Sequence, residues 1–256
     1  MRAISVKKTN LFFIIQATVA LFFINSQLLT ASESIQVKKK ESKINELVVY
    51  KPHEFGSMAE FNPFTFIING GLDTTQQPKV FSTDNFRENA LTVWDNITHP
   101  IYNINAGGGF GEFARVEIIG LHSLPNWTLH FLGNGLSFKM NEEWFYLNGL
   151  SRPYTYILAF FTVFSAGFMN ETVEKVTLPA TDTIADLLLF DPLGMLTFGF
   201  DIPSRFIMNT LKPSFWHYQP TYDPVSNKFL NVGLNFAFRP EIFGKKATPF
   251  AYVGMA

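Results

Sequence analysis

The sequence predicts a mixed, β-rich fold: an antiparallel meander, or an outer-membrane-type β-barrel left incomplete in the sequence as given, with two or three apolar helices packed against it. Residues 112–141 alternate between apolar and polar side chains in three successive segments, and residues 230–238 alternate in the same way. A two-residue period is typical of strands with one buried face. Charged residues make up only 16% of the chain, whereas soluble domains carry about 25%. The composition therefore favours a protein that faces lipid.

The N-terminus has the plan of a secretory signal peptide over residues 1–31. A basic start with Arg2, Lys7 and Lys8 precedes an apolar block over residues 11–24, and small and polar residues follow. Export signals have this order of regions. The block is shorter than the about 20 residues of a bilayer-spanning helix, so a retained anchor is the less favoured alternative. We expect export to the outer membrane or the periplasmic face of the envelope of a Gram-negative bacterium.

Downstream of the signal peptide, a polar linker is predicted over residues 32–60, where lysines and glutamates are interspersed, followed by an envelope domain over residues 61–256. The formal net charge of −1 argues against a nucleic-acid partner, because such proteins concentrate positive charge. The chain has no cysteine, which excludes disulfides and thiolate metal sites.

Turn chemistry supports the β meander over residues 112–141. Gly133–Asn134–Gly135 separates two of its alternating segments, and these residues accept the positive φ of a tight turn. An earlier alternation over residues 64–68 ends in the comparable turn sequence Asn69–Gly70–Gly71. Alternation of this kind predicts one apolar and one wet side of a sheet, and the apolar side faces either a core or lipid.

The segment 151–211 is predicted to be helical. Ser151–Arg152–Pro153 can start a helix because proline is tolerated in the first turn, and residues 153–170 carry no charge. We expect this helix to be buried in the protein or to lie at a membrane surface, with a membrane crossing as the alternative. A second helix is expected to begin at Thr181 or Asp182, which are good N-caps.

A C-terminal β hairpin is predicted over residues 229–256. Large apolar side chains of residues 230–238 would share one face, opposite small or polar ones, which is the pattern of a barrel strand between lipid and a wet lumen. A last strand without a neighbour would expose an edge that lipid cannot satisfy. We therefore expect the protein to continue beyond Ala256.

The order of sequence features from His99 onward resembles an uncharacterised family of secreted bacterial envelope proteins, known only as a domain of unknown function. The residues that carry the resemblance are His99–Pro100–Ile101–Tyr102, Gly149–Leu150–Ser151, Asn170–Glu171–Thr172, residues 179–188 and Asp191–Pro192–Leu193–Gly194. The resemblance implies an outer-membrane-associated, barrel-like domain with attached helices and implies no activity. This chain differs by the inserted meander, and by Met195 where a second glycine is expected.

A hydrolytic site is the main catalytic alternative. If the meander forms, His122, Ser123 and His130 lie close to Glu142, and a histidine base could activate the serine to cleave an ester. Ser123 is in a turn that ends in proline, so we favour structural roles for all four residues. The chain has no His-Glu-x-x-His motif and no clustered histidines, so we expect no catalytic metal and no cofactor.

Several acids lie among apolar residues and are predicted to form a structural polar network with a nearby arginine. An unpaired buried carboxylate is costly, so each should find a cation or helix-terminal amides. The network is predicted to contain Glu171, Glu174, Asp182, Asp186, Asp201 and Arg205. Asp201 and Arg205 are four residues apart and can pair on one helical turn.

The sequence therefore favours a structural or binding protein of the outer membrane, with membrane lipid as its partner and no evident catalysis. The first alternative is an outer-membrane, lipid-acting esterase or deacylase. The second is a small integral inner-membrane protein that crosses the bilayer through residues 153–170.

Overall fold

The computed structural model describes residues 42–52, 57–72, 85–120, 123–124, 127–174, 181–226, 228–240, 249 and 251–254. All the elements named below belong to one unit, Lys43–Ala256. The predicted signal peptide, most of the linker's first half, His122 and the end of the predicted C-terminal hairpin lie outside the described residues.

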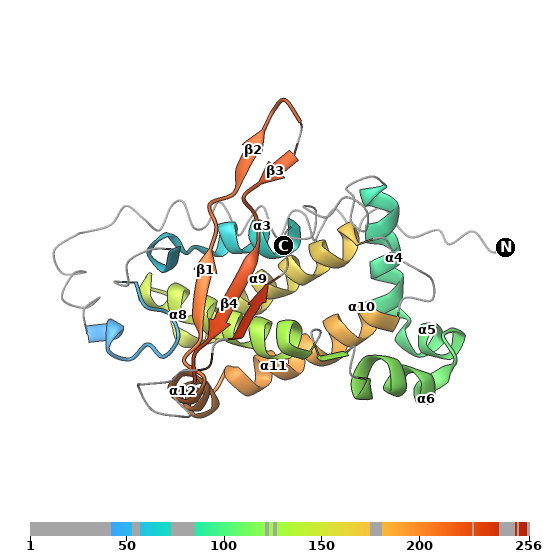
Figure 1. The fold of residues 1–256 in the computed structure, drawn as a ribbon, viewed down its shortest axis with the longest axis horizontal. Helices are drawn as coiled ribbons and strands as arrows, with labels where there is room; N and C mark the ends of the chain where they lie inside the picture. Colours follow the sequence, from blue (N-terminus) through green and yellow to red (C-terminus); the bar gives the residue numbers. More distant parts are fainter. Residues whose placement is uncertain are drawn as a thin grey trace. The chain divides into compact units, whose positions relative to one another are not determined.

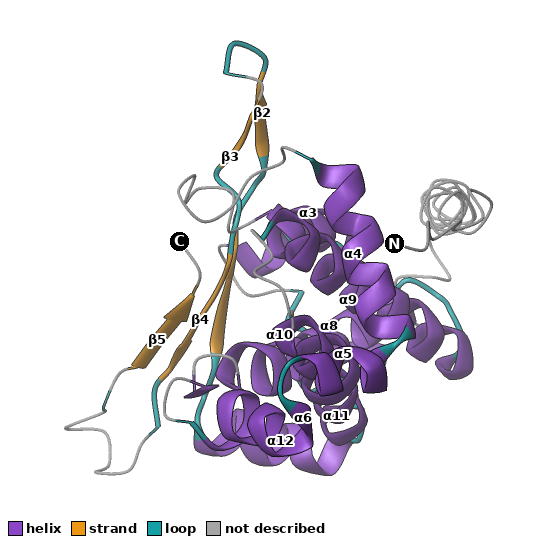
Figure 2. Ribbon diagram, turned by 90° about the vertical axis from the view of Figure 1, so that its right-hand side faces the viewer, coloured by secondary structure: helices purple, strands orange, loops and turns teal. Residues whose placement is uncertain are grey.

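The prediction of a β-rich fold or a barrel is wrong, because the described residues are mostly helical (Figure 2). The helical elements are η2 (Ser57–Glu60), α3 (Pro63–Leu72), α4 (Phe86–Thr98), α5 (Pro100–Ala106), α6 (Gly109–Phe113), η4 (Ala114–Ile119), η6 (Trp127–Asn134), α8 (Gly135–Leu147), α9 (Arg152–Val173), α10 (Thr181–Ala185), η7 (Asp186–Phe190), α11 (Asp191–Phe198) and α12 (Asp201–Thr210). Of these, η4, η6 and η7 are π-helical. The strands are few and short.

Helix α9, the long yellow helix of Figure 1, packs against both α3 and α8. Small side chains make this close packing feasible, since Ala159, Val163 and Ala166 line its buried side. The side-chain amide of Asn170 also donates to the Gly70 carbonyl of α3 at 3.1 Å. The predicted helix start at Ser151–Arg152–Pro153 is confirmed, because α9 begins at Arg152.

The predicted meander is wrong because its glycines allow close helix packing instead of turns. A Cβ atom at Gly135 would lie 2.7 Å from the Gly194 carbonyl oxygen, and one at Gly194 would lie 2.2 Å from that of Phe131. A Cβ atom at Gly133 would lie 2.9 Å from a ring carbon of Phe236. Residues 112–141 therefore continue through α6, η4, η6 and α8.

The predicted Asn69–Gly70–Gly71 turn fails for the same reason. Both glycines lie inside α3, and a Cβ atom at Gly71 would lie within 3.0 Å of three side-chain atoms of Met169 on α9. These glycines therefore mark a contact between helices. The alternation over residues 64–68 is too short to distinguish a strand from a helix.

The strands form two small antiparallel sheets beside the helices (Figure 2). In the first sheet, β4 (Leu234–Phe238) pairs with β1 (Ser214–His217) on one side and with β5 (Ala251–Gly254) on the other. In the second sheet, β2 (Thr221–Asp223) pairs with β3 (Lys228–Leu230). Asn231 and Gly233 have positive φ and separate β3 from β4. Residues 235–238 are all buried, so the predicted division into a lipid side and a wet side is wrong.

Two apolar clusters make up the core of the described residues. The larger joins α3, α8, α9 and α11 to β1 and β4 and includes Phe66, Met140, Val163 and Phe198. The smaller joins α5, α6 and α10 to η7 and includes Phe113 and Phe190. The described residues also contain two groups of charged side chains with buried members.

Candidate functional site

One exposed side of α9 and of the neighbouring 188–202 segment is apolar. On α9 the side chains of Tyr154, Ile157, Phe160 and Phe161 are exposed, and on the 188–202 segment those of Leu188, Leu193, Leu196, Phe200 and Ile202 are exposed. We call these nine residues the apolar face. Residues 153–170 and 192–200 contain no charged residue, so this surface lacks the ionic groups that normally solvate a helix.

The two parts of the apolar face belong to segments that contact one another at two points along α9. The Tyr156 hydroxyl donates to the Gly199 carbonyl at 3.2 Å. Eleven residues further along the helix, a Cβ atom at Gly167 would lie 3.0 Å from Leu187 and Asp191. Helix α9 is long and apolar enough to cross a bilayer, but half of its most apolar window is buried in the protein. It therefore offers one side, not its whole circumference, to a partner.

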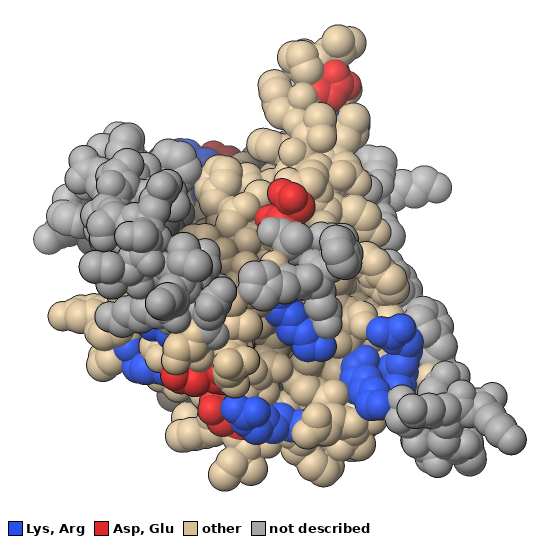
Figure 3. Space-filling model, turned by 90° about the vertical axis from the view of Figure 1, so that its left-hand side faces the viewer, with Lys and Arg blue, Asp and Glu red and all other residues tan. Residues whose placement is uncertain are grey.

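Charged residues are sparse on other parts of the surface as well. Figure 3 shows a face on which the described Lys, Arg, Asp and Glu side chains form a few groups separated by uncharged surface. Several of the charged residues of the chain are instead buried inside the protein.

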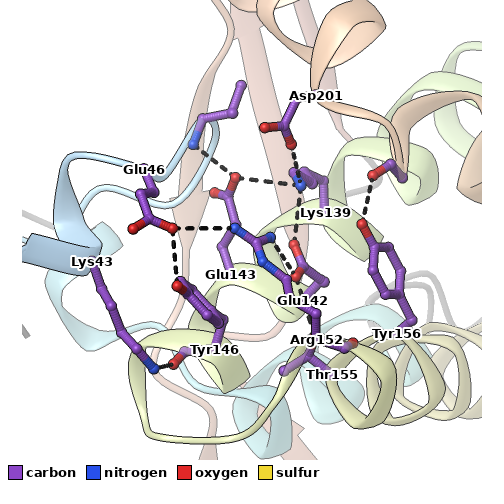
Figure 4. A network of polar contacts seen from close by, with 12 residues as sticks. Lys43, Glu46, Lys139, Glu142, Glu143, Tyr146, Arg152, Thr155, Tyr156 and Asp201 are labelled. Atoms are coloured by element: carbon purple, nitrogen blue, oxygen red, sulfur yellow. Dashed lines mark hydrogen bonds and ion pairs between the residues drawn. The ribbon is translucent and has the colours of Figure 1, made fainter.

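The first buried group is centred on Lys139 of α8, whose side chain is fully buried (Figure 4). Its Nζ atom lies 2.7 Å from Asp201 Oδ1 and 3.0 Å from Glu142 Oε2. Arg152 donates to the other oxygen of Glu142 at 2.8 Å. We call Lys139, Glu142, Glu143, Arg152 and Asp201 the lysine network; it joins α8 to the starts of α9 and α12.

Glu143 extends the lysine network to the segment that precedes η2. Its two carboxylate oxygens accept the backbone N–H groups of Val48, Val49 and Tyr50 at 2.7–2.8 Å. Burial raises the pKa of Glu143 to about 7, although these three hydrogen bonds and Lys139 act in the opposite direction. The carboxylate thus takes the place of a strand partner for residues 48–50.

The second buried group surrounds His130, a residue of η6. Its Nδ1 atom lies 2.9 Å from Asp191 Oδ1, and its Nε2 atom lies 3.3 Å from Asp186 Oδ2. Asn134 donates to the same Asp191 oxygen at 2.8 Å. Ligand atoms of His130, Glu171 and Asp186 all lie within 4.8 Å of one another.

Two further acids adjoin this group. Ligand atoms of Glu171, Glu174 and Asp182 also lie within 4.8 Å of one another, so Glu171 belongs to both sets. The Thr183 hydroxyl donates to Glu171 at 2.7 Å. We define the acid–histidine cluster as His130, Glu171, Glu174, Asp182, Asp186 and Asp191.

Burial and like charges hold protons in the acid–histidine cluster. Burial, together with the nearby Asp182 and Glu174 carboxylates, raises the pKa of Glu171 to about 8. Burial also raises the pKa of Asp186 well above its usual value. Burial lowers the pKa of His130, but the carboxylates of Asp186 and Asp191 outweigh it, so that this pKa is well above its usual value.

Two oxygens of the acid–histidine cluster have no hydrogen-bond partner among the described residues: Asp186 Oδ1 and Asp191 Oδ2. Both side chains are at most 3% exposed. A cavity of about 40 Å³ lies beside His130 and is lined in part by His130, Asn134 and Asn170. Buried acceptors without donors are rare and call for an explanation.

Comparisons with family models, curated proteins and solved structures found no match to this chain. The resemblance to the envelope-protein family therefore stays a prediction.

The predicted hydrolytic residues do not form one site in the described structure. The Ser123 hydroxyl donates to the Val116 carbonyl at 2.7 Å. His130 contacts Asp186 and Asp191, while Glu142 belongs to the lysine network. His122 lies outside the described residues.

The six residues predicted as one polar network lie in two places. Asp201 contacts Lys139 in the lysine network, and Arg205 lies 3.8 Å from Asp201. Glu171, Glu174, Asp182 and Asp186 lie around His130. Sequence reasoning missed Lys139 as the centre of the first group and Asp191 as the partner of His130. The spacing of Lys139 three and four residues before Glu142 and Glu143 was the signal for the former.

Proposed function

We propose that the protein is an exported envelope protein that binds the surface of a membrane through the apolar face. The observation that carries this proposal is the exposure of nine large apolar side chains on or next to two stretches, residues 153–170 and 192–200, that contain no charged residue. Large exposed apolar patches on monomers mark interaction sites. Lipid is the partner that the composition favours, since charged residues are scarce in the whole chain.

Energetics support such binding without a membrane-spanning helix. Full burial of one large apolar side chain contributes about 1.5–3 kcal/mol. Micromolar partitioning needs about 8 kcal/mol, so partial insertion of several of the nine side chains suffices. Because half of the α9 window is buried in protein, an orientation in the plane of the membrane satisfies both sides of this helix.

Vesicle flotation tests this proposal. The protein processed after residue 31 should float with phosphatidylcholine vesicles, and added anionic lipid should change the bound fraction little, because the face carries no charge. Combined Ile157→Ser, Phe160→Ser and Phe161→Ser substitutions should lower partitioning at least tenfold.

The matched control removes equally exposed apolar side chains elsewhere: Tyr222→Ser, Val225→Ser and Leu230→Ser on the hairpin of β2 and β3. This variant should float like the wild type. A processed protein that stays in the soluble fraction, or a triple α9 variant that floats normally, would contradict the proposal. Resistance to alkaline extraction would favour a spanning α9 instead.

A further inference from the structure

We propose that His130, Glu171 and Asp186 form a binding site for a divalent first-row transition ion of the Zn²⁺ type. This inference is independent of membrane binding. It rests on the donor set, on the distances within it, and on a buried carboxylate oxygen that has no partner.

The geometry around His130 is that of a metal ligand with its supporting carboxylate. Metal-binding histidines usually donate one ring N–H to a carboxylate and bind the ion with the other nitrogen. Here Asp191, held by Asn134, lies 2.9 Å from Nδ1, which is a normal charge-assisted hydrogen bond. This contact fixes the ring and leaves Nε2 directed at Asp186.

The contact at Nε2 differs from the one at Nδ1. Nε2 lies 3.3 Å from Asp186 Oδ2, longer than the about 2.7–2.9 Å of a charge-assisted hydrogen bond. Two ligands at about 2.1 Å from one Zn²⁺ in tetrahedral geometry lie about 3.4 Å apart. The separation of these two atoms therefore matches two ligands of one ion.

Charge balance also favours a cation. No ion pair in the described part of the chain joins Lys or Arg to Glu171, Asp186 or Asp191, and His130 contacts both aspartates. The Asp186 oxygen Oδ1 is buried and lacks a hydrogen-bond donor. Binding of a divalent ion would release the protons that these acids hold and would place positive charge beside this oxygen.

The donor atoms indicate the class of ion. Imidazole nitrogen combined with carboxylate oxygen suits Zn²⁺ and its first-row neighbours, whereas Ca²⁺ and Mg²⁺ prefer sites made of oxygen alone. The cavity beside His130 and Asn134 is large enough for a water molecule near the site.

Calorimetry on the full-length protein, purified in mild detergent and stripped with EDTA, tests the site. Zn²⁺ should bind with a stoichiometry of one and should compete with Co²⁺ but not with millimolar Ca²⁺ or Mg²⁺. Asp186→Asn and Glu171→Gln should each weaken Zn²⁺ binding at least tenfold. His130→Gln should change the visible spectrum of bound Co²⁺, because a nitrogen ligand is lost.

Asp201→Asn is the matched control, since it removes an acid from the lysine network, and it should bind Zn²⁺ like the wild type. Asn134→Ala keeps all ligands and only releases Asp191, so it should weaken binding about tenfold even if a ligand variant does not fold. Absence of Zn²⁺ binding, or affinity unchanged by Asp186→Asn, Glu171→Gln and Asn134→Ala, would overturn the assignment.

Discussion

The lysine network and the acid–histidine cluster both have buried charged residues at their centres, yet they differ in how their charges are matched. In the lysine network, each oxygen of Glu142 and Glu143 accepts a hydrogen bond, and Lys139 and Arg152 supply positive charge. In the acid–histidine cluster, no Lys or Arg of the described residues pairs with Glu171, Asp186 or Asp191, and two buried oxygens have no donor among those residues. Matched charges indicate a structural role, whereas buried acids without a cation indicate that something else binds there.

Removing the cation of the lysine network tests most strongly whether this network stabilises the fold. Lys139→Met should lower the free energy of unfolding by about 3–5 kcal/mol, because it removes the buried cation that faces the carboxylates of Glu142 and Glu143. Urea unfolding followed by circular dichroism measures the change. Arg115→Met, which disrupts an exposed pair with Glu112, should cost less than about 1 kcal/mol. Equal costs for the two variants would show that the network is not structural.

The pH dependence of the free energy of unfolding tests whether Glu143 is a buried carboxylate in the folded protein. Its pKa is about 7 in the folded protein and near 4.5 in the unfolded chain, so folding favours the protonated form. Its contribution is therefore fully present below about pH 4.5 and falls by about 3 kcal/mol as the pH rises through 7. Glu143→Gln should remove this decline in denaturant titrations at pH 4.5 and 8. Parallel pH profiles for the two proteins would argue against a buried carboxylate.

Close packing of η6 on α11 should be required for the acid–histidine cluster. Gly194→Ala places a Cβ atom against the Phe131 carbonyl, one residue from His130, and should lower stability by about 1–3 kcal/mol. Thermal unfolding measures this loss, and Gly111→Ala, where a Cβ atom meets nothing within 4 Å, is the control. A neutral Gly194→Ala variant would contradict the packing described for η6.

The buried side chain of His217 has no hydrogen-bond partner among the residues that the structure describes. Its ring lies 4.7 Å from that of Phe61, both of its nitrogens are unpartnered, and burial lowers its pKa to about 4. His217→Phe should raise the free energy of unfolding by about 1 kcal/mol at pH 7.5. The gain should grow toward pH 4, because the unfolded wild type binds a proton that the folded state resists. A destabilised variant at both pH values would indicate a missing polar partner.

The sequence predicted the helical elements better than the strands because their signals are local. Ser151 precedes the first turn of α9, and Thr181 is the first residue of α10. The alternation over residues 112–141 misled because its glycines, Gly133 and Gly135, permit close helix contacts with partners distant in the sequence. No local pattern reveals such a contact.

The same limit applies to the acid–histidine cluster. The acids of residues 171–186 were recognisable as buried carboxylates, but their partner His130 lies 61 residues before Asp191. Sequence reasoning predicted no metal site because the chain lacks clustered histidines. A single histidine becomes a candidate ligand only when folding places η6 against η7 and α11.

The most direct test of the distinction between the two groups compares Asp186→Asn with Glu142→Gln in EDTA at pH 8. Both substitutions replace a buried carboxylate by an amide of the same shape. The free energy of unfolding should be unchanged or higher for Asp186→Asn, since a repelled acid is removed, and lower by about 2–4 kcal/mol for Glu142→Gln. Equal losses in the two variants would contradict the account, because both groups would then be structural.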